Sequence, residues 1–246
     1  MKTAVFIPSR LASVRLPRKP LHLIAGVSLV ERVWRQASQS GFDVFIATDS
    51  DEIASHVASF GGKFIMTPAE CESGTERVAV ASKSLPDDYQ VIINVQGDEP
   101  LIAPDVIKDV ADQFQLRSSV LIATPITPLL DAADHANPNA VKVALATDGR
   151  ALYFSRSPIP YVREPKHTDA VGLFWKHIGV YGFRRKTLGQ LAELLPSKLE
   201  QAEKLEQLRW LDAGYPIQTV KVDYDSVAVD TIEDVHRVEE ILSRSK

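Results

Sequence analysis

The sequence predicts an α/β fold in which helices flank a mainly parallel central sheet. Short apolar runs alternate with helical segments in the first half of the chain, and a polar turn follows most of these runs. Strands alternating with helices are typical of βαβ units, whose strands pair in parallel. A chain of 246 residues with 45% hydrophobic residues can bury a sizeable core, and we expect a single domain over residues 1–246.

The first half of the chain carries the regular part of this pattern. Residues 4–8 form an apolar run that ends at a proline, which favours a buried strand, and residues 9–20 are expected to form a loop. Residues 29–40 have apolar side chains at helical spacing and end at Gly41. Further strands are expected at 44–47, 63–66 and 91–95, and a turn at 48–50 leads into a helix that ends near residue 60.

The second half is less regular. Strands are expected at 120–125, 141–146, 178–183, 220–222 and 227–229, and an amphipathic helix at 198–211. Residues 231–243 are predicted to form the closing helix. Thr231 suits its N-cap, and Glu233 and Asp234 then lie in the first turn, where the helix dipole favours acids.

Composition excludes several classes of function. The formal net charge is −4, so the chain lacks the basic field of a nucleic-acid-binding protein. It contains no run of about 18 apolar residues, so we expect no membrane span. The single cysteine, Cys71, rules out an intramolecular disulfide framework, and the N-terminal apolar run is too short for a signal peptide. We therefore expect a cytoplasmic protein.

A basic loop follows the first predicted strand. It carries Arg10, Arg15, Arg18 and Lys19 and no acid. Such a loop repels itself unless an anion lies among its cations, and ligands of open α/β sheets bind at the carboxyl ends of strands. A triphosphate gripped by arginine, lysine and backbone N–H groups would suit this position. A solvated basic loop is the alternative.

Two acids also lie at predicted strand ends. Asp98 belongs to the segment Gln96-Gly97-Asp98-Glu99 after the fourth strand, and Asp230 follows residues 227–229. Mg²⁺ takes oxygen ligands and usually binds one or two protein carboxylates beside substrate phosphates. Each acid has an equally plausible structural role: Asp98 can cap the turn before Pro100, and Asp230 can begin the last helix.

The segment Ser73-Gly74-Thr75 is a weaker signal. Its small residues, hydroxyls and glycine allow the backbone to approach a planar base or a ribose closely. A helix N-cap explains the same residues at least as well.

Eight segments, in order along nearly the whole chain, resemble one family. They are IPSRLASVRLPRKPL, ATDSDEI, SGTERV, NVQGDEPLI, NPNAVKV with ALYFSRSPIPY, KHIGVYGFR, LEQAEKLEQLRWL and AVDTIEDV. Together they resemble the 3-deoxy-manno-octulosonate (KDO) cytidylyltransferases, also called CMP-KDO synthetases. The resemblance implies a Rossmann-like nucleotidyltransferase fold with a small dimerisation subregion, a homodimer, Mg²⁺ dependence, and transfer of CMP from CTP to KDO for lipopolysaccharide synthesis.

The resemblance also implies roles for individual residues. Arg10, Lys19, Asp98 and Asp230 would be the catalytic residues, and the two acids would bind Mg²⁺. The remaining assignments place Ser9, Arg10, Arg15, Lys19, Ser73, Gly74 and Thr75 against CTP, and Gln96, Arg156, His177, Tyr181, Glu206 and Gln207 against the sugar acid. Arg156 could pair its planar guanidinium with the sugar carboxylate.

The chain departs from the family pattern at two places that matter. Arg18 stands where the family usually has glycine, which would alter the loop if that position needs a positive φ or a close approach. The stretch between Tyr161 and Lys176 is short, as in relatives that act on an 8-amino analogue of KDO. The same reaction on that analogue or on another acidic sugar is therefore an alternative, and a non-catalytic nucleotide-binding module is a more distant one.

Overall fold

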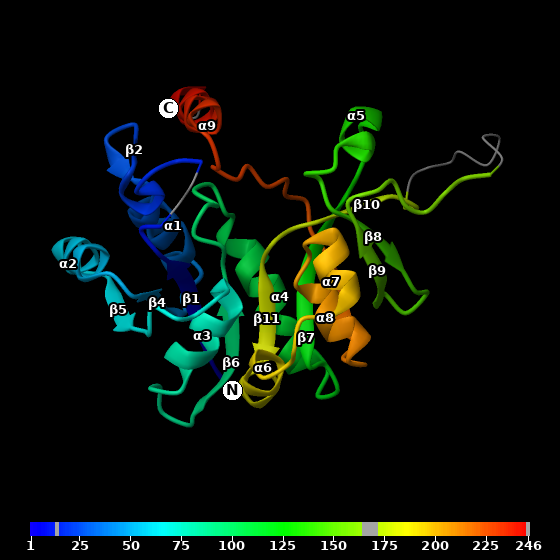
Figure 1. Cartoon of the computed structure of the whole chain (residues 1–246), viewed down its shortest axis with the longest axis horizontal. Helices are drawn as coiled ribbons and strands as arrows, with labels where there is room; N and C mark the ends of the chain where they lie inside the picture. The colour runs from blue at the N-terminus through cyan, green and yellow to red at the C-terminus, as the bar shows by residue number, and fades with distance from the viewer. Residues whose placement is uncertain (13–14, 164–171, 245–246) are drawn as a thin grey trace.

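The N-terminal strands form the parallel half of one large sheet. The computed structural model describes residues 1–12, 15–163 and 172–244 (Figure 1). Neighbouring strands pair in parallel in the order β5-β4-β1-β6, with bounds Lys63–Met66, Asp43–Thr48, Lys2–Ser9 and Tyr89–Asn94. All four strands predicted in this half are present, and their carboxyl ends lie along one edge of the sheet.

Strand β1 is buried on both faces, which explains why its sequence is apolar without alternation. Val5 and Ile7 belong to one hydrophobic cluster, Ala4 and Phe6 to the other, and none is exposed. The first cluster includes side chains of α1 (Leu29–Ser38), α2 (Asp51–Ser59), α4 (Pro104–Leu116) and α9 (Ile232–Arg244). The second includes side chains of α3 (Gly74–Ser82), α6 (Arg185–Ala192) and α8 (Gln207–Asp212). The α/β fold with helices on both faces of a mainly parallel sheet is thus confirmed.

Serine residues begin three of these helices. The hydroxyls of Ser28, Ser50 and Ser73 accept hydrogen bonds from the third backbone N–H of α1, α2 and α3. Each cap satisfies a donor that the helix itself cannot. Because α2 begins soon after the carboxyl end of β4, its N-terminus lies at the same sheet edge as the loops after β1 and β6.

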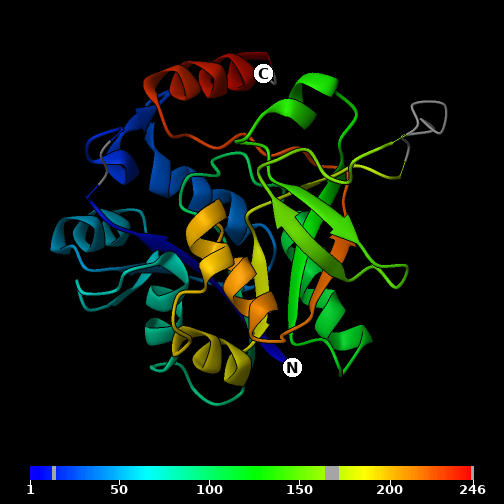
Figure 2. The same cartoon turned by 45° about the vertical axis from the view of Figure 1, so that its right-hand side comes forward.

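The second half of the chain completes the sheet with antiparallel strands. Beyond β6 the order continues β11-β7-β10-β8-β9, and β12 pairs in parallel with β7. The bounds of these six strands, in that order with β12 last, are Tyr181–Arg184, Ile122–Pro128, Trp175–His177, Lys142–Leu145, Ala151–Ser155 and Ile217–Lys221. Figure 2 brings the β8–β9 hairpin forward, with α7 (Lys198–Glu203) and α8 beside it.

The strand predicted at 178–183 is wrong as a single element. The structure places β11 over the second half of this run, where it pairs with β6 and β7. The preceding strand, β10, pairs with β7 and β8 and ends at His177, just before the run. Residues 178–180 lie between the two strands and belong to neither. Gly179 stands at this break, where an added Cβ would lie 3.3 Å from the Gln96 side chain. The chain changes neighbours here, which periodicity cannot reveal.

Two other predicted elements differ from the structure. The helix expected at 198–211 is two helices, α7 and α8, because Lys204 takes a left-handed conformation (φ 53°) that ends α7. The strand expected at 227–229 is a loop whose Val229 N–H donates to the carbonyl of Asp98, 2.8 Å away. That single hydrogen bond ties the segment to the end of β6 instead of adding a strand.

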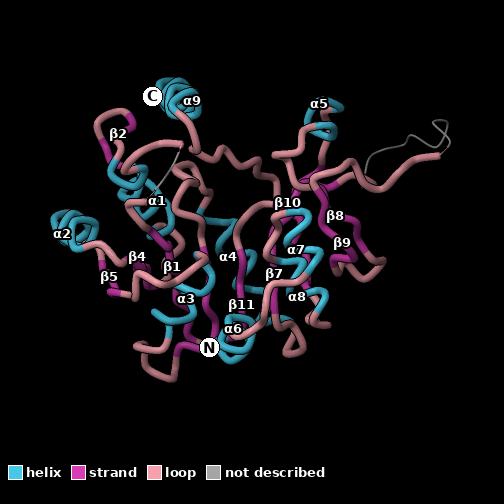
Figure 3. The backbone as a smooth tube through the Cα atoms, in the orientation of Figure 1, coloured by secondary structure: helices cyan, strands magenta, loops and turns pink. Residues whose placement is uncertain are grey.

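The C-terminal segment returns to the N-terminal half of the molecule. After β12 it crosses to α9, which lies beside the hairpin of β2 (Leu23–Ile24) and β3 (Val27–Ser28) in both views (Figures 2 and 3). The backbone N–H of Ala25 donates to Glu239 of α9 at 2.7 Å. A short 3₁₀ turn, η1 (Lys19–Leu21), precedes this hairpin, and a small helix, α5 (Ala132–Ala136), lies before β8. Among the described helices, none is long and apolar enough to cross a membrane.

Candidate active site

A cleft opens at the carboxyl ends of β1 and β6. Its volume is about 470 Å³, and its walls come from the loops after these strands, the start of α3 and the loop before α9. It lies where open α/β sheets bind ligands. The predicted site residues that line it are Ser9, Arg10, Arg15, Lys19, Ser73, Gly74, Gln96, Asp98 and Asp230.

Glycine allows the three loops to meet. A Cβ on Gly97 would lie 2.8 Å from the Pro8 carbonyl oxygen, and one on Gly74 would lie 3.1 Å from Pro8 Cγ. The first distance is too short for any side chain, so the end of β6 can approach the end of β1 only with glycine at position 97. This close approach brings the polar side chains of both loops to one cleft.

Lys19 joins the two predicted metal ligands. Its Nζ lies 2.9 Å from Asp98 Oδ2 and 2.9 Å from Asp230 Oδ1. The guanidinium of Arg15 reaches the same Asp230 oxygen at 3.0 Å. Burial opposes the charge of Lys19, but the two carboxylates outweigh this effect and raise the pKa of the ammonium. Lys19 therefore stays charged, and the two acids converge on one cation.

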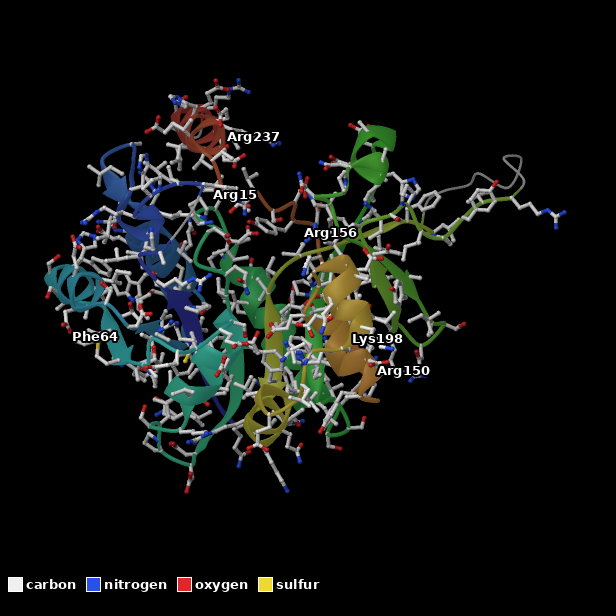
Figure 4. The ribbon with its side chains drawn as sticks, in the orientation of Figure 1. Arg15, Phe64, Arg150, Arg156, Lys198 and Arg237 are labelled. Carbon is white, nitrogen blue, oxygen red and sulfur yellow. The ribbon has the colours of Figure 1, made fainter. Side chains whose placement is uncertain are left out.

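Arg10 differs from the other cations of the cleft, which are paired with acids. Its side chain is exposed, and among residues 1–12, 15–163 and 172–244 no carboxylate forms an ion pair with it. Figure 4 shows Arg15 just below α9 and Arg156 near the centre of the view, at the upper end of α7. The guanidinium of Arg10 is thus available to an anion.

Arg18 lies just outside the cleft in a strained conformation. Its φ of 57° and ψ of 31° place it in the left-handed region, immediately before Lys19. Its guanidinium forms an ion pair with Glu52 in the first turn of α2. The position therefore has the positive φ for which glycine is suited, and the chain holds arginine there with an ion pair to a neighbouring helix.

Ser73 and Thr75 bind a further acid, Glu206, behind the cleft. Their hydroxyls donate to the two oxygens of Glu206, at 2.8 and 2.5 Å, while Ser73 also caps α3. Burial raises the pKa of Glu206, and these two hydrogen bonds oppose the rise. The N-cap interpretation of Ser73 is correct, and its hydroxyl in addition links α3 to the start of α8.

His177 and Tyr181 lie deeper, behind Glu206. The ring of His177 packs against Phe154 and Tyr181, and its Nε2 lies 3.0 Å from Thr124 Oγ1. Burial lowers the pKa of His177 to about 3, so the imidazole is neutral. The buried hydroxyl of Tyr181 has no hydrogen-bond partner among the described residues, and burial raises its pKa well above the ordinary value. Gln207 is buried at the start of α8.

Arg156 holds backbone segments together. Its guanidinium donates to the carbonyls of Glu203 at 2.7 Å, Pro138 at 3.0 Å and Lys204 at 3.3 Å. The fully buried Lys142 donates to the carbonyls of Asn137 and Arg156 at 2.8 and 2.5 Å. The structure thus gives Arg156 a positioning role, and the assignment to the sugar carboxylate stays a prediction.

Sequence reasoning missed one buried charge of the cleft. Arg77 lines it with a side chain only 3% exposed, paired to Asp49 at 2.9 Å and bonded to Thr67 at 2.5 Å. Asp49 follows β4, at the same sheet edge as Asp98. Its place after a predicted strand was the available signal, but the pairing with Arg77 depends on how α3 packs.

The donor set of the cleft suits a metal ion held jointly with phosphates. No group of three or more His, Cys, Asp or Glu side chains in the described part of the chain is arranged to bind a metal alone. The oxygens of Asp98 and Asp230 instead converge on one point, as their shared contact with Lys19 Nζ demonstrates. Two carboxylates beside a polyphosphate are the usual ligands of Mg²⁺, so these residues fit that ion.

Comparisons with known proteins agree with this geometry. The model of a family described as cytidylyltransferase matches residues 4–222. The 3-deoxy-manno-octulosonate cytidylyltransferase of Myxococcus xanthus is 47% identical over 98% of this chain and 96% of its own. The protein of the same name from Chloroherpeton thalassium is 44% identical over 99% of both.

Solved structures extend the likeness to the whole fold. A CMP:2-keto-3-deoxy-manno-octonic acid synthetase complexed with CTP superposes with a TM-score of 0.93, 37% identity and full coverage of both chains. A 4-diphosphocytidyl-2C-methyl-D-erythritol synthase from Anaerococcus prevotii, 12% identical with a TM-score of 0.64, shares the fold alone. The chain belongs to the 3-deoxy-manno-octulosonate cytidylyltransferase family.

Proposed function

We propose that this protein transfers CMP from CTP to 3-deoxy-D-manno-octulosonate, which yields CMP-KDO and pyrophosphate and activates the sugar for lipopolysaccharide synthesis. The observation that carries the proposal is the cleft itself. Arg10, which has no acidic partner in the described ranges, and Lys19 face two converging carboxylates there, at the carboxyl ends of β1 and β6. Two relatives that match over nearly their whole length bear the name of this activity.

The chemistry follows from the charges of the reacting groups. The anomeric hydroxyl of the sugar attacks the α-phosphorus of CTP, the bond to the β-phosphate breaks, and pyrophosphate leaves. Negative charge grows on the phosphoryl and leaving oxygens, so catalysis depends on positioning and electrostatic stabilisation. We assign Arg10, Arg15 and Lys19 to the phosphates. Ser9, Ser73, Gly74 and Thr75 are assigned to the rest of the nucleotide.

Asp98 and Asp230 would hold Mg²⁺ in this reaction. Bound there, the ion would neutralise phosphate charge and lower the pKa of the attacking hydroxyl. The chain contributes the positions of the two carboxylates: the Val229 N–H donates to the Asp98 carbonyl, and Asp234 accepts from the backbone N–H groups of Asp230 and Thr231 at 2.9 and 2.8 Å. These hydrogen bonds fix the backbone on both sides of the metal site.

We assign the sugar acid to the space between the cleft and the residues behind it. Gln96 lines the cleft, while Glu206, His177, Tyr181 and Gln207 continue from the Ser73 loop toward β11. The buried Tyr181 hydroxyl supports this assignment, because it has no hydrogen-bond partner within the described part of the chain and buried polar groups usually have one. Arg156 is assigned to the sugar carboxylate, at the far side of the same region.

The decisive experiment measures pyrophosphate release with CTP and a panel of sugar acids. We expect KDO to be the best substrate, and Asp98→Asn protein, which keeps the shape of the side chain, to serve as the inactive control. Faster release with the 8-amino analogue or with a sialic acid would reassign the sugar but keep the reaction. No release with any acceptor would refute the proposal in favour of a nucleotide-binding module.

We further propose a cytoplasmic homodimer, since CTP is an intracellular nucleotide and the family resemblance implies a dimer. Leu130, Leu152 and Tyr161 support a self-association surface: their exposed fractions are 82%, 61% and 88%, and all three belong to the half of the chain that forms β7–β9 and the segment after it. Light scattering at micromolar concentration tests this. A dimer is expected, Leu152→Glu should weaken it, and a monomeric wild-type protein would contradict the proposal.

A further inference from the structure

One lysine stands where the predicted metal ion belongs. Asp98 and Asp230 are far apart in the chain, yet one oxygen of each lies 2.9 Å from Nζ of Lys19. The side chain of Lys19 is only 17% exposed, less than either acid at 28% and 35%. The ammonium thus fills the point on which both carboxylates converge.

A divalent ion and this ammonium cannot share that point. Mg²⁺ binds carboxylate oxygens at about 2.0–2.1 Å. An ion bound to both acids would therefore lie between them, where the Lys19 ammonium now lies. The repulsion between the two cations is added to the steric conflict. Binding of a metal to both carboxylates therefore requires Lys19 to withdraw.

The charges of the cleft indicate where the lysine goes. Two carboxylates are balanced here by Lys19 and Arg15, since Arg15 also contacts Asp230 at 3.0 Å. A divalent ion would balance the same two carboxylates by itself and would release the lysine charge. Arg10 lies in the same cleft without an acidic partner among the described residues, so a polyphosphate bound there would offer the released ammonium new oxygens.

We propose that Lys19 is a resident cation that is exchanged for the metal: the polyphosphate draws the ammonium away from Asp98 and Asp230, and the divalent ion takes its place. This inference rests on the proposed function for the identity of the polyphosphate as CTP. The exchange makes nucleotide and metal binding mutually supportive, because each ligand favours the arrangement that the other requires. Without nucleotide, the metal has to displace the lysine into water and binds weakly.

The first test measures the binding of Mn²⁺ in the absence of nucleotide, with the electron paramagnetic resonance signal of Mn²⁺ as the readout. We expect Lys19→Met protein to bind Mn²⁺ at least about tenfold more tightly than the wild type, on the scale of one lost charge-assisted contact. Lys63→Met is the matched control, since it removes the same charge from a lysine of β5 that is paired with Asp43 of β4. It should bind Mn²⁺ as the wild type does.

Two further measurements locate the gain. Adding Asp98→Asn to Lys19→Met should abolish the tighter Mn²⁺ binding, because one of the two freed carboxylates is then lost. In EDTA, calorimetry should find weaker CTP binding to Lys19→Met than to the wild type and to Lys63→Met. Circular dichroism and thermal unfolding verify that each variant is folded.

The outcomes separate this inference from the proposed function. Equal Mn²⁺ affinity of Lys19→Met and wild type would overturn the resident-cation role, even if the wild type converts CTP and KDO normally. Unchanged CTP affinity in EDTA would overturn the transfer of the ammonium to the phosphates. Tighter Mn²⁺ binding with weaker CTP binding supports the exchange, and it would do so even if none of the tested sugars were an acceptor.

Discussion

Arg18 offers a direct measurement of backbone strain beside the cleft. Its φ of 57° lies in the left-handed region, and its guanidinium pairs with Glu52. We compare Arg18→Gly with Arg18→Ala. Both variants lose the ion pair, but only alanine keeps a Cβ in the unfavourable conformation. The difference between the two variants therefore reports the strain, reduced by the greater freedom of glycine in the unfolded chain.

The expected magnitude follows from three contributions. A left-handed conformation costs a residue with a Cβ about 1–2 kcal/mol. The additional freedom of glycine in the unfolded chain lowers the stability of Arg18→Gly by about 0.4–1 kcal/mol and so offsets part of the relieved strain. Arg18→Gly should thus be more stable than Arg18→Ala by roughly 0.5–1 kcal/mol. The lost ion pair, with side chains 60% and 48% exposed, is worth roughly 0.2–1 kcal/mol and brings Arg18→Gly back close to the wild type.

Urea denaturation and thermal unfolding measure this difference. A difference of 0.5–1 kcal/mol corresponds to about 1–4 °C in Tm for a chain of this size. Glu52→Gln, which removes the ion pair and keeps Arg18, should lose only the smaller ion-pair contribution. If Arg18→Ala proves as stable as Arg18→Gly, the position is not strained, and the physical account of this departure from the family glycine is wrong.

Three further predictions concern the site and the interior. Asp98→Ala and Asp230→Ala should each reduce kcat at least about a hundredfold at saturating Mg²⁺ without unfolding the protein; near-normal turnover of either would remove that acid from the metal site. CTP should exceed UTP by at least about tenfold in kcat/KM, because a pocket that pairs with the cytosine edge leaves groups unpaired with uracil; equal rates would exclude such a pocket. His177 is neutral when folded because burial lowers its pKa to about 3, whereas it protonates near 6.5 when unfolded. The neutral imidazole therefore contributes fully to stability above pH 6.5, and this contribution is lost as the pH falls toward 3, by up to about 1.4 kcal/mol per pH unit. Urea titrations should show that the free energy of unfolding falls less steeply with decreasing pH for His177→Gln than for the wild type.

Local patterns predicted the parallel half of the sheet and the cleft residues closest to it. Short apolar runs gave β1, β4, β5 and β6, and the polar residues directly after β1 and β6 line the cleft, as strand-end geometry requires. Arg10 and Asp98 were identifiable in this way because each lies within a few residues of a strand end, and Lys19 because it belongs to the basic loop that follows β1. The helix caps likewise depend only on neighbours in sequence.

Long-range packing decided what the sequence could not. The run at 178–183 looked like one strand, but only its second half belongs to β11, because the chain leaves β10 and changes neighbours at residues 178–180. The loop at 227–229 was apolar enough for a strand, yet its position is set by the hydrogen bond from Val229 to Asp98. Glu206 was assigned only through resemblance, since nothing near it in sequence indicates that the hydroxyls of Ser73 and Thr75 converge on it.

The crossing of the C-terminal segment to the N-terminal loops also has a consequence for synthesis of the protein. Lys19 and Asp230 are 211 positions apart, so the lysine's second contact can form only after a ribosome that adds about 5–20 residues per second has reached Asp230. Until then the emerging chain contains the basic loop and Asp98 but lacks Asp230, which contacts Arg15 and Lys19 in the folded protein. A nascent chain halted before residue 230 should contain most of the sheet yet be unable to assemble the paired carboxylates.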